Sequence, residues 1–152
     1  MLTEEDRAIY EWQLDVTGFG EEGQERLRNT TALVSRIGGL GGPIAFALAA
    51  AGIGKLILAH AGNLRKDDLN RQILMQWEGL GKPRVESAAK TLAAFNPKIE
   101  IEIHNENLSE NNADALVSKA DIVFASAPLF EERFLMNLEC VRQSKTMIDC
   151  AM

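Results

Sequence analysis

The segment from Leu33 to His60, "LVSRIGGLGGPIAFALAAAGIGKLILAH", constrains the fold of this chain most strongly. An apolar run enters a glycine cluster, a helix of small residues follows, and a second apolar run closes the segment. In the dinucleotide fingerprint G-x-G-x-x-G, the glycines permit a tight turn, close approach of the backbone to a pyrophosphate, and close helix packing. Gly38 and Gly41 hold its second and third places, whereas Arg36 holds the first, and His60 stands where an acid would bind a ribose.

Apolar and amphipathic segments alternate along the rest of the chain. Strands are expected at residues 30–35, 55–59, 99–103, 121–126 and 146–151, and helices at 20–29, 41–51, 83–96, 109–119 and 130–143. Ser109 is the expected N-cap of its helix. The isoleucines at 99–103 alternate with polar residues, which predicts a strand at the edge of a sheet.

This alternation predicts a doubly wound, mostly parallel α/β sheet of Rossmann-like type with helices on both faces. Ligands bind such sheets at the carboxyl ends of the strands, close to the point where the strand order reverses. In this chain those ends are residues 36–38, 60–62 and 126–128.

Length and charge restrict the class of protein. The 152 residues suffice for one domain spanning residues 1–152, and the net charge of -6 disfavours binding to nucleic acid. The longest weakly polar run, Pro43 to Ile53, is too short to span a membrane. An acidic N-terminus without a secretory signal favours a cytoplasmic protein.

The cysteines predict neither a zinc site nor a disulfide framework. Cys140 and Cys150 are the two cysteines, and they form no C-x-x-C pair. Both are expected to be buried, reduced thiols, because free cysteine is among the most buried residue types.

Six segments, "GFGEEGQERL", "GGLGGP", "LAAAGIGKL", "LNRQ", "GKPRVESA" and "FNP", occur in an order and spacing that resembles the ThiF/MoeB/HesA proteins, which are related to the ubiquitin-activating enzymes. The resemblance covers about Tyr10 to Ile148. It implies that ATP and Mg²⁺ activate the C-terminal Gly-Gly carboxylate of a ubiquitin-like or sulfur-carrier protein. The carboxylate attacks the α-phosphate, pyrophosphate leaves, and an acyl-adenylate forms.

The same resemblance implies a homodimer, or a heterodimer with a homologue, with "IYEW" and "VTGF" near the N-terminus as apolar pairing surface. The family's later cysteine and its zinc-binding C-x-x-C pairs lie beyond the region covered. The domain is therefore expected to lack the family's C-terminal part.

The resemblance also assigns the residues of a nucleotide site. Its members are Gly38, Gly39, Gly41, Arg36, His60, Arg71, Gln72, Lys82 and Arg84. Arg71 and Arg84 are the catalytic candidates. Arg71 would bind phosphate as a planar donor, Arg84 replaces the family's lysine, and Lys82 would add a second charge.

Several positions depart from the family's pattern. Its ribose-facing acids match His60 and Gly62, and its magnesium-binding aspartate matches Pro128. The arginine that reaches into the partner's site matches Trp12, and the asparagine ahead of Arg71 matches Asp68. No residue is therefore predicted to bind a metal.

Individual residues leave alternatives open. Arg36 either contacts phosphate or occupies the space that glycine would leave, and occlusion is the expected outcome. His60 either contacts the nucleotide or is a partly exposed polar residue. Trp12 is expected to pack at an interface or in the core. Arg71 either binds phosphate or forms a surface ion pair with Asp67 or Asp68.

Three functions follow from these patterns. The first is a family member that binds ATP and a Gly-Gly-tailed carrier for adenylation. The second is a degenerate, non-catalytic member that acts as the binding or scaffold partner of an active homologue. The third is an NAD- or FAD-dependent oxidoreductase, against which the incomplete fingerprint and the missing acid at position 60 argue. The sequence leaves open whether the chain is an enzyme.

Overall fold

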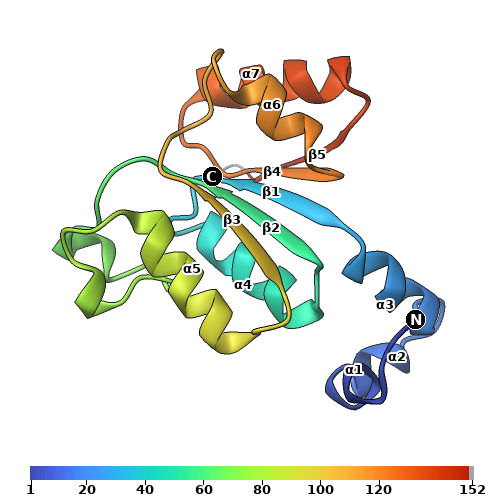
Figure 1. The fold of residues 1–152 in the computed structure, drawn as a ribbon. Helices are drawn as coiled ribbons and strands as arrows, with labels where there is room; N and C mark the ends of the chain where they lie inside the picture. Colours follow the sequence, from blue (N-terminus) through green and yellow to red (C-terminus); the bar gives the residue numbers. More distant parts are fainter. Residues whose placement is uncertain (151–152) are drawn as a thin grey trace.

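A computed structural model describes residues 1–150 and contains one five-stranded parallel sheet with the strand order β3-β2-β1-β4-β5 (Figure 1). The strands are β1 (Thr31–Ser35), β2 (Lys55–Ala59), β3 (Glu100–His104), β4 (Ile122–Ala125) and β5 (Thr146–Asp149). From β1 the chain moves outward to β2 and β3, then returns to the other side of β1 for β4 and β5. The reversal point therefore lies between β1 and β4, and the predicted doubly wound α/β fold is confirmed.

Helices cover both faces of the sheet (Figure 1). The α-helices are α1 (Glu4–Ile9), α2 (Glu11–Leu14), α3 (Gly20–Arg28), α4 (Gly41–Ala51), α5 (Arg84–Phe95), α6 (Ala113–Ser118) and α7 (Phe130–Arg142), and short 3-10 turns are η1 (Lys66–Asp68) and η2 (Trp77–Gly79). No helix within residues 1–150 has both the length and the apolar character that crossing a bilayer requires.

The period of two along each strand divides the core into two clusters. On one face, Val34 of β1 and Leu56 of β2 pack against α4 and α5. On the other face, Leu33 and Ile57 pack against α6 and α7. Figure 1 shows these helix pairs on opposite sides of the sheet. Both strands are buried on both faces, which explains why their sequences are continuously apolar.

Most element boundaries agree with the sequence. The strand expected at an edge is β3, and it is an edge strand. The final strand, expected at 146–151, ends at Asp149, and residue 151 lies outside the described residues.

The helix expected from Ser109 is a correction. It starts at Ala113, with Asn112 at the N-cap. The Ser109 N–H donates to Asn112 Oδ1 at 2.8 Å, and the Asn112 N–H donates to the Ser109 carbonyl at 3.1 Å. A side-chain-stabilised turn therefore precedes the helix, because a short asparagine side chain competes for backbone donors.

The cysteines also differ from expectation. Cys140 is buried in the core beside α6, and burial raises the pKa of its thiol. Cys150 is only half-buried, because it follows the edge strand β5. The prediction of two buried thiols is therefore wrong for Cys150.

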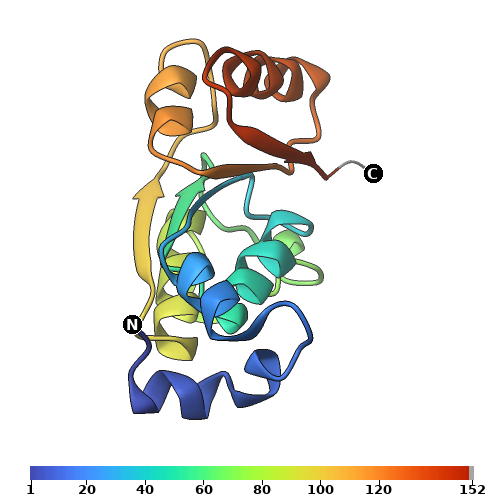
Figure 2. The ribbon, with the colours of Figure 1, turned by 90° about the vertical axis from the view of Figure 1, so that its right-hand side faces the viewer.

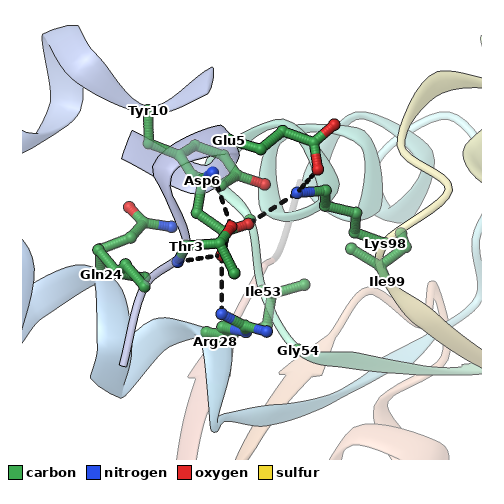
Figure 3. Close-up of a pocket in the computed structure, with 12 residues that line it drawn as sticks. Thr3, Glu5, Asp6, Tyr10, Gln24, Arg28, Ile53, Gly54, Lys98 and Ile99 are labelled. Atoms are coloured by element: carbon green, nitrogen blue, oxygen red, sulfur yellow. Dashed lines mark hydrogen bonds and ion pairs between the residues drawn. The ribbon is translucent and has the colours of Figure 1, made fainter. Parts of the chain in front are cut away.

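The buried carboxylate of Asp6 links the N-terminal helices to the rest of the domain. These helices lie at the end of the molecule opposite α6 and α7 (Figure 2). Asp6 of α1 is buried, and its oxygens accept from Arg28 at 2.8 Å, Lys98 at 2.9 Å and the Thr3 hydroxyl at 2.7 Å (Figure 3). The hydrogen bond from Lys98 and those from Thr3 hold the pKa of Asp6 far below its usual range. Asp6 thus joins the first helix to segments more than 20 and 90 residues away.

Candidate functional site

A cavity of about 490 Å³ lies where the strand order reverses, at the carboxyl ends of β1, β2 and β4. It is lined by Arg36, Gly38, Gly39, Leu40, His60, Arg71, Gln72, Ser126, Ala127, Pro128, Arg133 and Cys150. The fold therefore brings together the three strand ends at which the sequence predicts a ligand.

The glycine loop forms one wall of this cavity. A Cβ at Gly41 would lie 2.6 Å from the Arg36 carbonyl oxygen, so only glycine permits this close approach between α4 and β1. Gly39 lies beneath the side chain of Arg71, whose Cγ is 3.4 Å from the position of a Cβ. Within residues 1–150, the N–H groups of Gly39 and Leu40 donate to no protein acceptor. They stand ahead of the eleven-residue helix α4, where unpaired amides and the helix dipole attract anions.

Arg36 has a left-handed backbone conformation that is typical of glycine, and its side chain forms an ion pair with a buried carboxylate. Its φ is 58°, in the left-handed region that favours glycine. Its Nε and Nη2 donate to Glu132 Oε2 at 2.9 and 2.7 Å. Glu132 belongs to α7 and its side chain is only 6% exposed. This pair draws the guanidinium to α7, while Arg36 still lines the cavity beside Gly38, and occlusion of the phosphate position stays a prediction.

Three buried side chains of the cavity each leave one polar atom without a partner among the described residues. These atoms are His60 Nδ1, Gln72 Oε1 and Ser126 Oγ. The three residues are 9%, 5% and 8% exposed. A buried polar atom without a hydrogen bond costs about 1–3 kcal/mol, so three together in one cavity indicate a polar ligand or ordered water.

The orientation of Gln72 follows from its neighbour. Its Nε2 donates to Asp68 Oδ1 at 2.7 Å. An ionised carboxylate only accepts hydrogen bonds, so the amide nitrogen must face Asp68, which leaves Oε1 as the free acceptor. A ligand at this atom must therefore present a donor.

His60 is a neutral imidazole at the end of β2. Burial lowers its pKa from the ordinary 6.5 to about 4, and the positive charges of Arg84 and Arg36 contribute in the same direction. The residue is buried, which disagrees with the prediction of a partly exposed polar side chain.

Arg71 and Arg133 supply cationic groups to the cavity. Arg71 is half-exposed, and its Nη2 lies 3.5 Å from Asp68 Oδ1. The ion pair with Asp68 that the sequence left open for Arg71 is thus present, with a long nitrogen–oxygen distance. Arg133 comes from the first turns of α7, stacks over the Phe130 ring and donates to Asp149 Oδ1 at 2.9 Å.

Asp68 is the centre of a buried hydrogen-bond network behind the cavity. Its Oδ2 accepts from Arg84 Nη2 at 2.8 Å and from the Arg65 N–H at 3.0 Å. Arg84 also donates to the Ala61 carbonyl at 3.2 Å. Hydrogen bonds from Arg65 and Arg84 keep the pKa of Asp68 low although its burial alone would raise it. Arg84 is therefore engaged with protein and does not line the cavity.

Four other positions named from the sequence, Gly41, Lys82, Gly62 and Trp12, are not in the cavity lining. Lys82 lines a separate hollow with Glu86 and Lys90. Gly62 has a φ of +87°, and a Cβ there would lie 2.8 Å from Arg84 Nη1. Arg84 thus occupies the space beside a position where the family has an acid. Trp12, expected to pack at an interface or in the core, is 86% exposed, so it does not lie in the core, and packing at an interface stays a prediction.

Sequence reasoning missed Leu40, Arg133 and Cys150 in the lining, and it named Ser126 only as part of a strand end. Ser126 lies in the loop after β4, at one of the strand ends named in advance, so its place was a usable signal. Arg133 approaches from a helix on the far side of the reversal point. No local pattern marks it as a cavity residue.

The lining residues do not fit a magnesium site. Mg²⁺ is held in proteins by one or two carboxylates together with substrate phosphates. The cavity has no Asp or Glu in its lining, and Pro128 stands where the resemblance implies a magnesium-binding aspartate. Within residues 1–150, no three His, Cys, Asp or Glu side chains gather as a metal-binding group.

Curated relatives of this chain include HesA and MOCS3 proteins. "Protein HesA, vegetative" from Trichormus variabilis is 46% identical over 151 residues, which is 99% of this chain and 57% of that protein. The adenylyltransferase and sulfurtransferase MOCS3 of Drosophila willistoni is 35% identical, over 97% of this chain and 32% of its own length. The chain thus spans little more than half of its HesA relatives.

Solved structures show the same fold. The E. coli tRNA N6-threonylcarbamoyladenosine dehydratase TcdA, in complex with ATP, matches with a TM-score of 0.90 and 20% identity, over 98% of this chain and 61% of that one. The sequence itself matches the ThiF family over residues 10–152. This match covers nearly the whole chain and agrees with the HesA and MOCS3 relatives, and we conclude that the chain belongs to the ThiF family.

Proposed function

We propose that this chain binds an adenine nucleotide in the cavity at the strand reversal. The observation that carries the proposal is the presence of three buried, unpartnered polar atoms, on His60, Gln72 and Ser126, in one cavity. The phosphates would contact the free amides of the glycine loop and the guanidinium of Arg71. TcdA has been solved with ATP, which supports an adenine nucleotide as the ligand.

A carrier protein is the second ligand that we propose. MOCS3 is named as an adenylyltransferase and sulfurtransferase. By analogy, the C-terminal Gly-Gly tail of a ubiquitin-like or sulfur-carrier protein would place its carboxylate beside the α-phosphate. Arg71 would orient the phosphates in this arrangement, and Arg84 would act indirectly by fixing Asp68 and, through it, Gln72.

A non-catalytic role is the second candidate, and one observation favours it. The cavity lining has no carboxylate to bind Mg²⁺, the ion that the family's chemistry uses when it is bound. We therefore propose that this domain binds nucleotide and carrier but forms the acyl-adenylate weakly or not at all. ATP–pyrophosphate exchange with Gly-Gly-tailed carriers should be weak or absent, and robust exchange would establish the adenylating function instead.

Nucleotide binding is tested by calorimetric titration with ATP in buffers with and without Mg²⁺, where saturable binding in either buffer supports the proposal. Arg71→Ala should weaken that binding by about 1.5–3 kcal/mol, the scale of a charged hydrogen bond. Arg65→Ala is the matched control, because Arg65 lies nearby on the same loop, is exposed, and pairs its side chain with Asp67. A folded protein that binds ATP in neither buffer would contradict the proposal.

We also propose pairing with a second copy or a related chain through the N-terminal helices. Ile9, Trp12 and Val16 there are 53%, 86% and 56% exposed. Sedimentation at increasing concentration should show association that Trp12→Glu weakens. A monomer at all concentrations would argue against this pairing.

A further inference from the structure

The charged groups that line the cavity all have the same sign. Arg36, Arg71 and Arg133 lie in the lining, and no Asp or Glu accompanies them. Each of these arginines is paired with a carboxylate outside the lining, which partly compensates its charge, so the lining itself presents guanidinium donors and no acid. Guanidinium donors without a carboxylate beside them in the lining favour an anionic ligand.

The carboxylates nearest to the cavity are already committed to arginines. Glu132 Oε2 accepts from Arg36, and Asp149 accepts from Arg133. Both oxygens of Asp68 accept hydrogen bonds, Oδ1 from Gln72 and Oδ2 from Arg84. These acids hold and orient the cationic and amide groups, and moving Asp68 to a metal ion would break its buried pair with Arg84. Glu132 keeps one oxygen, Oε1, without a partner among the described residues, but Glu132 does not line the cavity.

The remaining polar atoms of the lining are neutral. His60 Nδ1, Gln72 Oε1 and Ser126 Oγ can exchange neutral hydrogen bonds with hydroxyl or amino groups of a ligand. None of the three offers the charged oxygen that Mg²⁺ prefers. The ligand that matches the whole lining is a polyphosphate anion attached to a polar neutral group.

We infer that this cavity binds the nucleotide free of magnesium, with arginines and loop amides neutralising its phosphates, so that Mg²⁺ competes with the protein for the nucleotide. The inference rests on the proposed nucleotide site and specifies its ligand. Magnesium cancels part of the phosphate charge and occupies phosphate oxygens, which removes contacts that Arg71 and the glycine loop would make. Charge-assisted bonds between arginine and phosphate are the strong ones, so their loss weakens binding.

The test is calorimetric titration of the folded protein with ATP in EDTA and with ATP in excess Mg²⁺, at the same ionic strength because surface charge is screened by salt. Metal-free ATP is expected to bind about tenfold more tightly, the change that one lost charged hydrogen bond produces. Tighter binding of the magnesium complex would overturn the inference while leaving the proposed function intact. Binding of neither form would overturn both.

Two variants sharpen the comparison. Pro128→Asp places a carboxylate in the lining, so it should weaken binding of metal-free ATP and move the preference toward the magnesium complex. Arg71→Ala should weaken metal-free ATP by about tenfold or more and the magnesium complex by less. Arg65→Ala should change neither affinity. Equal losses for both forms in Arg71→Ala would contradict the role assigned to its charge. Circular dichroism checks that each variant is folded.

Discussion

Replacing Arg36 with glycine sets two structural effects against each other. The φ of 58° at Arg36 costs an ordinary residue about 1 kcal/mol, and glycine removes that strain. The same change leaves Glu132 without its partner, and its side chain is only 6% exposed. Removing one member of a buried ion pair costs about 3–5 kcal/mol, because an uncompensated charge stays in the protein. Arg36→Gly should therefore lower the free energy of unfolding by about 2–4 kcal/mol.

The assay is urea unfolding followed by circular dichroism at pH 7, with the midpoint and slope compared between variant and parent. The double variant Arg36→Gly with Glu132→Gln removes the stranded charge, so it should recover most of the loss. An Arg36→Gly variant as stable as the parent would refute the reasoning, since backbone strain would then outweigh the pair. Failure of the double variant to recover would show that Glu132 is not the cause.

Three further predictions follow from other contacts. Asp6→Asn should lower the free energy of unfolding by about 2 kcal/mol at pH 7. Because the pKa of Asp6 is depressed in the folded protein, the parent should lose this stabilisation as the pH falls below about 4. In urea unfolding, the stability of the variant should therefore depend less on pH in the acid range than that of the parent. The pKa of His60 is lowered to about 4, so between pH 6.5 and 4 the unfolded chain binds a proton at this residue that the folded chain does not. The free energy of unfolding should therefore fall as the pH falls through that range. An NMR titration of the imidazole with a midpoint near 6.5 would contradict this. Gly41→Ala should destabilise the domain by about 1–3 kcal/mol, because the new Cβ would meet the Arg36 carbonyl oxygen at 2.6 Å; unchanged thermal unfolding would show that α4 moves freely.

Local patterns were sufficient to predict the architecture. The short, continuous apolar runs of β1 and β2 predicted buried strands, and the alternation in β3 indicated an edge strand. The start of α6 could not be read in the same way. Ser109 and Asn112 are both good N-caps, and the choice between them depends on a hydrogen bond within the turn.

The candidate site was predictable in position but not in its electrostatics. The strand ends and Gly38, Gly39, Arg71 and Gln72 line the cavity as the sequence indicated. The partner of Arg36 lies 96 residues further on, and nothing local shows that Glu132 turns the guanidinium away. Arg84 was predicted to be a nucleotide-site residue, and its contact with Asp68 could not be foreseen because it forms only when the loop folds back.

The two outer strands of the sheet differ in how they meet solvent. On β3, Glu100 and Glu102 are both paired with Lys55, and Glu102 is also paired with Lys119. A network of ion pairs therefore runs along the β3 edge. Charges of this kind discourage a foreign strand from adding to a sheet. On β5, Ile148 is 43% exposed, and no comparable network of ion pairs runs along the part of this edge that the structure describes. The two edges of the sheet thus differ in charge, and the described part of the β5 edge has fewer of the paired charges that oppose strand addition.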